Sequence, residues 1–142
     1  MNTKTEQTVA RILFNYSIKI STAESCTGGL LSSRLTDVAG SSSYIKENFV
    51  TYANEAKIEL LDVSQETLET YGAVSEQCAK EMAEGLYKKT GCDVAISTTG
   101  IAGPTTPEAG KPVGLMYVAI KNKCALAVKK IEVNPHNSRK MI

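Results

Sequence analysis

The run TAESCTGG at residues 22–29 is the segment of this chain best suited to nucleophilic chemistry. It follows a short β-branched run and precedes an apolar-periodic one, so the pattern predicts a strand, a sharp turn and a helix. Ser25 would then lie at the carboxyl end of a strand, where it could attack a carbonyl carbon. The N–H groups of Thr27, Gly28 and Gly29 would bind the resulting oxyanion. The same residues also suit a plain helix cap, because serine and threonine are favoured N-caps and glycines permit close packing.

A second candidate segment, FVTYANEAK, occupies residues 49–57. Tyr52 falls near the end of an expected strand, and Lys57 falls near the start of a helix that Asn54 would cap. The positive end of the helix dipole and burial in a cleft both disfavour a charged ammonium, so Lys57 could act as a neutral base toward a serine. Glu55 opposes this effect if its side chain is close. The alternative interpretation is a solvated lysine and a tyrosine on the rim.

A third candidate segment, STTGIAGP at residues 97–104, leaves a buried strand at its carboxyl end. Open α/β sheets bind ligands at this place, and Gly100 and Gly103 would let a substrate approach the backbone closely. Exposed N–H groups there could hold a phosphate, a ribose or an amide. The glycine spacing matches neither the Walker loop nor the Rossmann fingerprint. A flexible glycine loop without a ligand is the competing interpretation.

Cysteine and histidine usage narrows the chemistry. The four cysteines, at positions 26, 78, 92 and 124, are irregularly spaced, which argues against a disulfide framework and against a metal site. Cys26 is a rival nucleophile, but alternation along a strand end predicts that it faces away from Ser25. The only histidine, His136, lies close to the C-terminus. We therefore expect a base other than histidine at Ser25, and no zinc site.

Composition sets broader bounds on the function. The chain has 142 residues, of which 42% are hydrophobic and 22% charged, as expected for one soluble domain over residues 1–142. A net charge of +1 does not indicate a direct nucleic-acid or membrane partner. The sequence shows neither a long apolar span nor a signal peptide, so we expect a cytoplasmic location.

The elements that must position these residues follow from hydrophobic periodicity and capping signals. Helices are expected over residues 6–17, 27–37, 54–61, 65–71 and 76–90, and strands over residues 19–23, 44–52, 93–99, 113–121 and 124–133. Helices alternate with strands early in the chain, and a hairpin ends it. This order predicts one α/β domain with a mixed β-sheet and helices on its faces.

Six motifs occur together in this chain: AESCTGG at 23–29, DVAGSS at 37–42, FVTYANEAK at 49–57, GAVSE at 72–76, STTGIAGP at 97–104 and KPVG at 111–114. In this order and spacing they resemble the CinA C-terminal domain family, which includes the nicotinamide-nucleotide amidohydrolases. The resemblance implies a three-layer α/β/α domain that hydrolyses the carboxamide of nicotinamide mononucleotide to nicotinic acid mononucleotide and ammonia, without a cofactor. It also implies a serine nucleophile, a lysine base and a nearby tyrosine, which correspond to Ser25, Lys57 and Tyr52.

Two departures from the family pattern affect the expectations. Many family members carry this domain behind a larger one, so this chain reads as the stand-alone form. Family chains also continue through a Gly-Asp-Arg-like segment into a closing C-terminal helix, whereas residues 134–142 read NPHNSRKMI. Arg139 is the expected counterpart of the family's substrate-binding arginine, and the closing helix is expected to be missing.

A missing closing helix has two consequences for the interpretation. The strand at residues 124–133 should expose apolar surface, which predicts a homo-oligomer. The same loss favours the alternative function, a non-catalytic CinA-like module that binds a nucleotide or a partner and is linked to competence or DNA damage.

Overall fold

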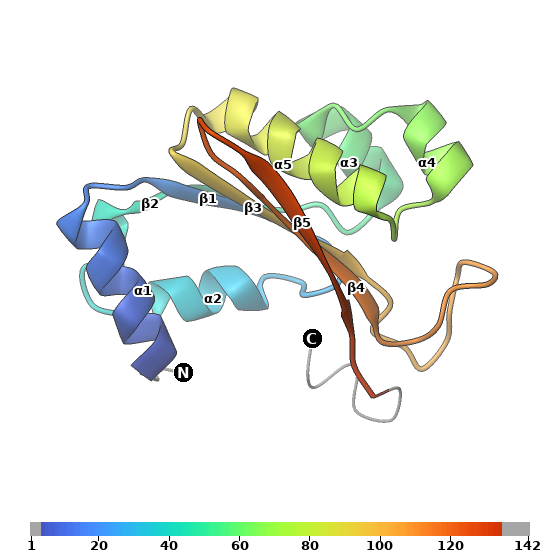
Figure 1. Ribbon diagram of the computed structural model, residues 1–142, viewed down its shortest axis with the longest axis horizontal. Coiled ribbons are helices and arrows are strands. Elements are labelled where there is room, and N and C mark those ends of the chain that lie inside the picture. The colour runs from blue at the N-terminus through green and yellow to red at the C-terminus, as the bar shows by residue number, and fades with distance from the viewer. Residues whose placement is uncertain (1–3, 135–142) are drawn as a thin grey trace.

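A five-stranded mixed sheet runs through the middle of the molecule (Figure 1). The computed structural model describes residues 4–134, so Arg139 and His136 lie outside the described residues. In spatial order the strands are β2 (Ile45–Val50), β1 (Ile20–Glu24), β3 (Val94–Gly100), β4 (Leu115–Lys121) and β5 (Leu126–Glu132). β1 pairs in parallel with β2 and β3, whereas β4 pairs antiparallel with β3 and β5. The carboxyl ends of β1, β2 and β3 therefore meet at one edge of the sheet.

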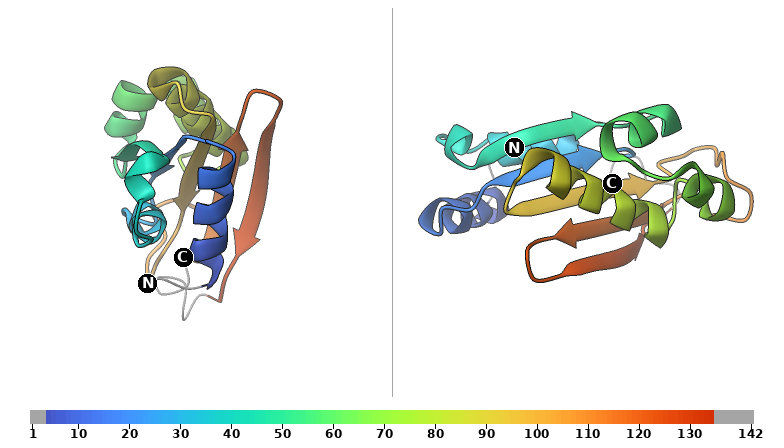
Figure 2. Two further views of the ribbon diagram at one scale, coloured as in Figure 1. Left: turned by 90° about the vertical axis from the view of Figure 1, so that its left-hand side faces the viewer. Right: turned by 90° about the horizontal axis from the view of Figure 1, so that it is seen from above.

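Helices cover both faces of the sheet (Figures 1 and 2). One face carries α1 (Lys4–Asn15) and α2 (Leu30–Thr36), and the short 3-10 turn η1 (Ser41–Ser43) leads into β2. The other face carries α3 (Asn54–Leu61), α4 (Gln65–Tyr71) and α5 (Glu76–Thr90). This arrangement confirms the predicted three-layer α/β/α architecture with a mixed sheet.

The longest helix, α5, supplies most of the buried helical side chains on the sheet face that also carries α3 and α4. Its buried side chains recur at helical spacing and pack across β1, β3, β4 and β5 (Figure 2). Ser75 caps its start by accepting a hydrogen bond from the N–H of Cys78 (3.1 Å). A Cβ atom on Gly85 would lie 1.8 Å from the carbonyl oxygen of Leu61, so α3 crosses α5 in backbone contact. This close crossing holds α3 against the body of the domain.

The face beside α2 remains partly open. Met116, Val118 and Ile120 of β4 form an apolar groove with Leu30 and Leu31 of α2, and Ile120 and Leu30 are 44% and 45% exposed. Within residues 4–134 no helix follows β5 to cover this groove. The exposed apolar surface therefore lies on β4 and α2, whereas the sequence led us to expect it on the strand at residues 124–133, whose larger apolar side chains are partly buried. Self-association through it stays a prediction, which light scattering can test.

None of the helices within residues 4–134 is both long and apolar enough to cross a membrane.

Candidate active site

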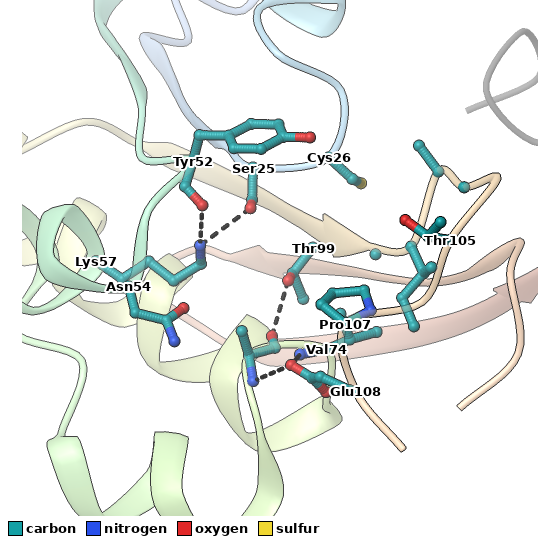
Figure 3. A pocket seen from close by; sticks show the side chains of 15 residues that line it. Ser25, Cys26, Tyr52, Asn54, Lys57, Val74, Thr99, Thr105, Pro107 and Glu108 are labelled. Carbon is teal, nitrogen blue, oxygen red and sulfur yellow. Dashed lines mark hydrogen bonds between the residues drawn. The ribbon is translucent and has the colours of Figure 1, made fainter. Parts of the chain in front are cut away.

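Ser25 is the first residue after β1, at the edge where the parallel strands end. Its N–H donates to the carbonyl oxygen of Thr98 on β3 (3.0 Å), so the parallel pairing of β1 and β3 continues to the serine itself. The side chain faces a cavity of about 420 Å³, and the residue is 8% exposed (Figure 3). The structure thus places the hydroxyl where the sequence predicted, in a cleft at the carboxyl end of the sheet.

Lys57 reaches Ser25 from the neighbouring helix α3. Its Nζ donates to Ser25 Oγ (3.0 Å) and to the carbonyl oxygens of Thr51 (2.9 Å) and Tyr52 (3.0 Å) (Figure 3). These carbonyls belong to the short connection between β2 and α3. Because the connection is short, α3 begins beside the end of β1, and Lys57, the fourth residue of α3, points back at the serine. The lysine is 1% exposed, so the interpretation of a solvated surface lysine is wrong.

Burial lowers the pKa of Lys57 from its ordinary value of 10.5, against weaker opposing effects of Cys78, Cys26, Glu108 and Glu55. Within residues 4–134 no carboxylate forms an ion pair with the amine. A neutral amine has two N–H donors and one lone pair. In this neutral form the carbonyl oxygens of Thr51 and Tyr52 accept from the two N–H groups, so the lone pair is left for the Ser25 hydroxyl, which then donates to the amine instead of accepting from it. This geometry suits a general base.

Helix capping differs from the expectation at the start of α3. Asn54 was expected to be the N-cap, but Ala53 holds that position without a side-chain hydrogen bond. Asn54 is the first helical residue, and its side chain lines the cavity near Lys57 (Figure 3). The Asn54 amide is therefore part of the cavity lining and does not cap the helix.

Tyr52 contributes to the site in two different ways. Its carbonyl oxygen orients the Lys57 amine, while its side chain is 60% exposed and forms part of the cavity rim. The ring extends away from the amine of Lys57 (Figure 3). Its contact with the lysine is therefore through the main chain, and the aromatic ring faces the mouth of the cavity.

The three residues predicted to bind an oxyanion, Thr27, Gly28 and Gly29, do not line the cavity. They form a turn, and α2 begins at Leu30 instead of residue 27. The N–H of Gly28 donates to the carbonyl oxygen of Ser25 (3.1 Å). The structure therefore does not bring these three residues together with Ser25 and Lys57 around the ligand space.

A buried carboxylate, that of Glu24, occupies the N-terminus of α2 instead. It accepts hydrogen bonds from the N–H groups of Leu31 (2.8 Å) and Ser32 (2.9 Å), and from the hydroxyls of Thr27 (2.6 Å) and Ser32 (2.5 Å). Burial acts to raise the pKa of Glu24, but these hydrogen bonds outweigh it and hold the pKa below 4.5. Sequence reasoning missed this role, because Glu24 ends β1 and lies six positions before Leu30, the first residue of α2.

Cys26 shares the cavity with Ser25, so the expectation that it faces away is wrong. Burial raises the pKa of its thiol to about 11. At neutral pH the thiol is therefore protonated and a weak nucleophile. This favours Ser25 over Cys26 as the attacking group.

Gly100 and Gly103 both line the cavity, as the sequence suggested. At Gly100 a Cβ atom would lie 2.8 Å from the carbonyl oxygen of Leu115 and 3.1 Å from Cys26 Sγ, so the position requires glycine for close packing. Thr99, Ile101 and Ala102 of the same predicted segment also line the cavity. Sequence reasoning did not identify the lining residues of the α4–α5 turn and of the later part of the loop after β3, which are Ala73, Val74, Thr105, Pro107 and Glu108.

Within residues 4–134, no three His, Cys, Asp or Glu side chains are grouped so as to hold a metal ion.

Comparison with known proteins identifies the family. A family model for the CinA C-terminal domain matches residues 2–142. The chain belongs to the CinA C-terminal domain family.

Curated CinA relatives are considerably longer than this chain. It is 53% identical over 122 residues to a CinA-like protein of Chlorobium limicola, covering 86% of this chain and 28% of that protein. It is 51% identical over 128 residues to a putative competence-damage inducible protein of Clostridium novyi, covering 90% of this chain and 31% of that protein. The chain thus spans about a third or less of the curated CinA relatives that it matches.

Solved structures of the CinA superfamily share the whole fold. The competence/damage inducible protein CihA from Agrobacterium tumefaciens superimposes with a TM-score of 0.87 at 38% identity, covering 98% of this chain and 89% of that one. The competence damage-inducible protein A from Klebsiella pneumoniae gives a TM-score of 0.90 at 34% identity, covering 96% of this chain and 86% of that one. The CinA fold described above is therefore shared with these proteins.

Proposed function

We propose that this CinA-family chain is an amidohydrolase in which Ser25 is the nucleophile and Lys57 the general base. The observation that carries the proposal is the contact between a buried lysine amine and a serine hydroxyl (3.0 Å) at the wall of a cavity. A serine with an adjacent base is the arrangement that acyl transfer requires. Nicotinamide mononucleotide, the substrate implied by the family resemblance, has a carboxamide that such a pair can hydrolyse, and a cavity of about 420 Å³ suits a small molecule.

The proposed reaction proceeds through an acyl-enzyme. The neutral amine of Lys57 takes the Ser25 proton as Oγ attacks the carboxamide carbon. The tetrahedral intermediate then collapses, and the nitrogen leaves as ammonia with the proton that Lys57 returns. Water, deprotonated by Lys57, cleaves the ester to release the carboxylic acid and restore the Ser25 hydroxyl. The carbonyls of Thr51 and Tyr52 keep the lysine amine oriented throughout.

The oxyanion of that intermediate needs N–H donors outside the start of α2, because Glu24 accepts from Leu31 and Ser32 there. One candidate is the N–H of Cys26, the residue directly after the nucleophile and itself part of the cavity lining. Backbone N–H groups directly after a nucleophile commonly serve this purpose. Tyr52 at the rim would cover the bound nicotinamide ring.

The test is ammonia release from nicotinamide mononucleotide by the 142-residue chain and its variants. Ser25→Ala should lose activity by about 1,000-fold or more, as expected for loss of a nucleophile. Cys26→Ala removes the rival nucleophile and should retain turnover. Ser33→Ala, on the exposed side of α2, is the control for loss of a serine hydroxyl. Equal rates for wild type and Ser25→Ala would refute the assignment.

The same measurement addresses the alternative function. A wild-type chain that binds nicotinamide mononucleotide in a calorimeter but releases no ammonia would be a non-catalytic nucleotide-binding module.

A further inference from the structure

Two segments far apart in the sequence form the cavity wall that lies across from Lys57 (Figure 3). One is the turn between α4 and α5, which supplies Ala73 and Val74. The other is the loop at residues 101–114 between β3 and β4, which supplies Thr105, Pro107 and Glu108 among others. At its two ends the loop continues the backbone pairing of β3 and β4, since the N–H of Ile101 donates to the carbonyl oxygen of Leu115 (2.8 Å) and the N–H of Gly114 donates to that of Ile101 (2.8 Å). Between these ends, the place of the loop against the cavity depends on particular side chains.

Glu108 joins the loop to the turn. Its Oε1 accepts hydrogen bonds from the N–H groups of Ala73 (2.8 Å) and Val74 (3.2 Å) (Figure 3). A Cβ atom on Gly72 would lie 2.5 Å from Glu108 Oε2, so the carboxylate packs directly on the turn backbone. The backbone of the GAVSE motif at residues 72–76 thus binds the carboxylate of a glutamate from the loop.

Lys111 completes the junction from the KPVG motif. Its Nζ donates to Glu108 Oε2 (2.6 Å) and to the carbonyl oxygens of Tyr71 (2.5 Å) and Val74 (2.7 Å), which uses all three ammonium donors. The Glu108 and Lys111 side chains are only 21% and 25% exposed. Partial shielding from water makes this pair stronger than an ordinary surface ion pair.

The loop is also braced internally. The Thr106 hydroxyl lies within hydrogen-bond distance of the carbonyl oxygens of Glu108 (2.9 Å) and Lys111 (3.0 Å). The stretch from Thr106 to Lys111 therefore docks on the turn as a unit.

We propose that Glu108 and Lys111 are positioning residues that hold the loop 101–114 against the α4–α5 turn and thereby set the affinity of the cavity for its substrate. The effect on substrate rests on the function proposed above. Neither side chain hydrogen-bonds to Ser25 or Lys57, and the charge of Glu108 has only a minor effect on the pKa of Lys57 beside that of burial. The pair therefore acts mainly on the shape of the wall and leaves the serine–lysine contact in place. Loss of the pair should raise KM while changing kcat little, since the binding surface is disturbed and the reacting groups are not.

The test compares Lys111→Met with Lys80→Met. Lys80 forms an exposed ion pair with Glu76 (2.9 Å) on α5, so both variants remove one positive charge and one ion pair. Hydrogen exchange of the unliganded protein is the first readout. In Lys111→Met we expect at least about tenfold faster exchange across residues 101–114 and 71–75, with α5 protected as in wild type. Lys80→Met should exchange like wild type in both segments.

Kinetics with nicotinamide mononucleotide are the second readout. Lys111→Met should raise KM at least about fivefold with kcat within about twofold of wild type. Glu108→Gln, which keeps an acceptor oxygen but no charge, should shift KM in the same direction by less. The double variant should be no worse than Lys111→Met alone, because both residues act through the same junction between the loop and the turn.

Failure of this proposal is distinguishable from failure of the proposed function. Unchanged exchange in the loop of Lys111→Met would overturn the positioning role whatever the activity. A loss in kcat with KM unchanged would overturn it also. If wild type releases no ammonia, the amidohydrolase proposal fails, while exchange and calorimetric nucleotide affinity still decide the role of the pair. If Lys111→Met does not fold, Glu108→Gln provides the same two readouts.

Discussion

Ser25 Oγ and Lys57 Nζ lie 3.0 Å apart in the structure, although 32 positions separate the two residues in the sequence. The lysine is held there by two main-chain carbonyls, those of Thr51 and Tyr52, and by no carboxylate among the described residues. Carbonyl oxygens orient an amine without supplying the full negative charge that would keep it protonated. The site therefore combines a fixed direction for the amine with an environment that favours its neutral form.

The first prediction concerns the pH dependence of turnover. Because burial lowers the pKa of Lys57, the neutral base becomes populated below pH 10.5, and kcat/KM should rise with pH through one ionisation whose midpoint lies below that value. Lys57→Arg should be nearly inactive at every pH, since a guanidinium does not deprotonate in proteins. The measurement is the pH–rate profile of ammonia release for both proteins. A fully active Lys57→Arg variant would exclude Lys57 as the base.

The second prediction concerns stability. Between the lowered pKa of folded Lys57 and 10.5, the unfolded chain keeps a proton that the folded chain has released. In that window the free energy of unfolding should rise with pH by about 1.4 kcal/mol per pH unit from this group. Lys57→Met lacks the titration, so wild type should gain stability relative to it as pH increases. Urea unfolding of both proteins from pH 7 to 10 measures the difference, and a constant difference would contradict the expectation.

The third prediction concerns Glu24, whose carboxylate is fully buried and accepts four hydrogen bonds. Glu24→Gln places an amide NH₂ against N–H donors, which should cost about 2–4 kcal/mol of unfolding free energy at pH 7. It should also reduce turnover, because the Ser25 turn depends on this carboxylate. Glu66→Gln on the exposed side of α4 is the control.

Acid unfolding checks the same residue independently. The pKa of folded Glu24 lies below 4.5, so its stabilising contribution is complete above that pH and is lost as the pH falls through the lowered value. The stability difference between wild type and Glu24→Gln should therefore shrink on acidification. A difference that grows at low pH would show that the carboxyl group is protonated in the folded protein.

The fourth prediction concerns the crossing of α3 and α5. Alanine is intrinsically better than glycine in a helix by about 1 kcal/mol, but a Cβ atom at position 85 would lie 1.8 Å from the carbonyl oxygen of Leu61. Gly85→Ala must separate the two helices, so we expect a net loss of about 2–3 kcal/mol in unfolding free energy. Lys88→Ala, on the exposed side of α5, should be close to neutral. Thermal unfolding distinguishes the two, and a stabilised Gly85→Ala would contradict the observed contact.

Much of the local structure could be predicted because it depends on neighbouring residues. The β-branched run before Ser25 and the apolar periodicity after it specify a strand, a turn and a helix, and the Ser75 cap with Gly91 sets the ends of α5 within the sequence itself. Motif spacing likewise indicated Ser25, Lys57 and the glycine loop at the end of β3. These signals are local hydrogen bonds, backbone conformations and side-chain periods, all of which a single segment expresses.

Tertiary structure determined which of these segments contact one another. Parallel pairing of β1 with β2 and β3 brought Lys57 to Ser25, and burial between α3 and the sheet lowered the pKa of the lysine. Packing also directed the Glu24 carboxylate into the N-terminus of α2, which removed Thr27, Gly28 and Gly29 from the cavity, and it joined Glu108 to the α4–α5 turn. Contacts between distant segments depend on strand order, register and the desolvation of each group, and these quantities exist only once the whole chain has packed.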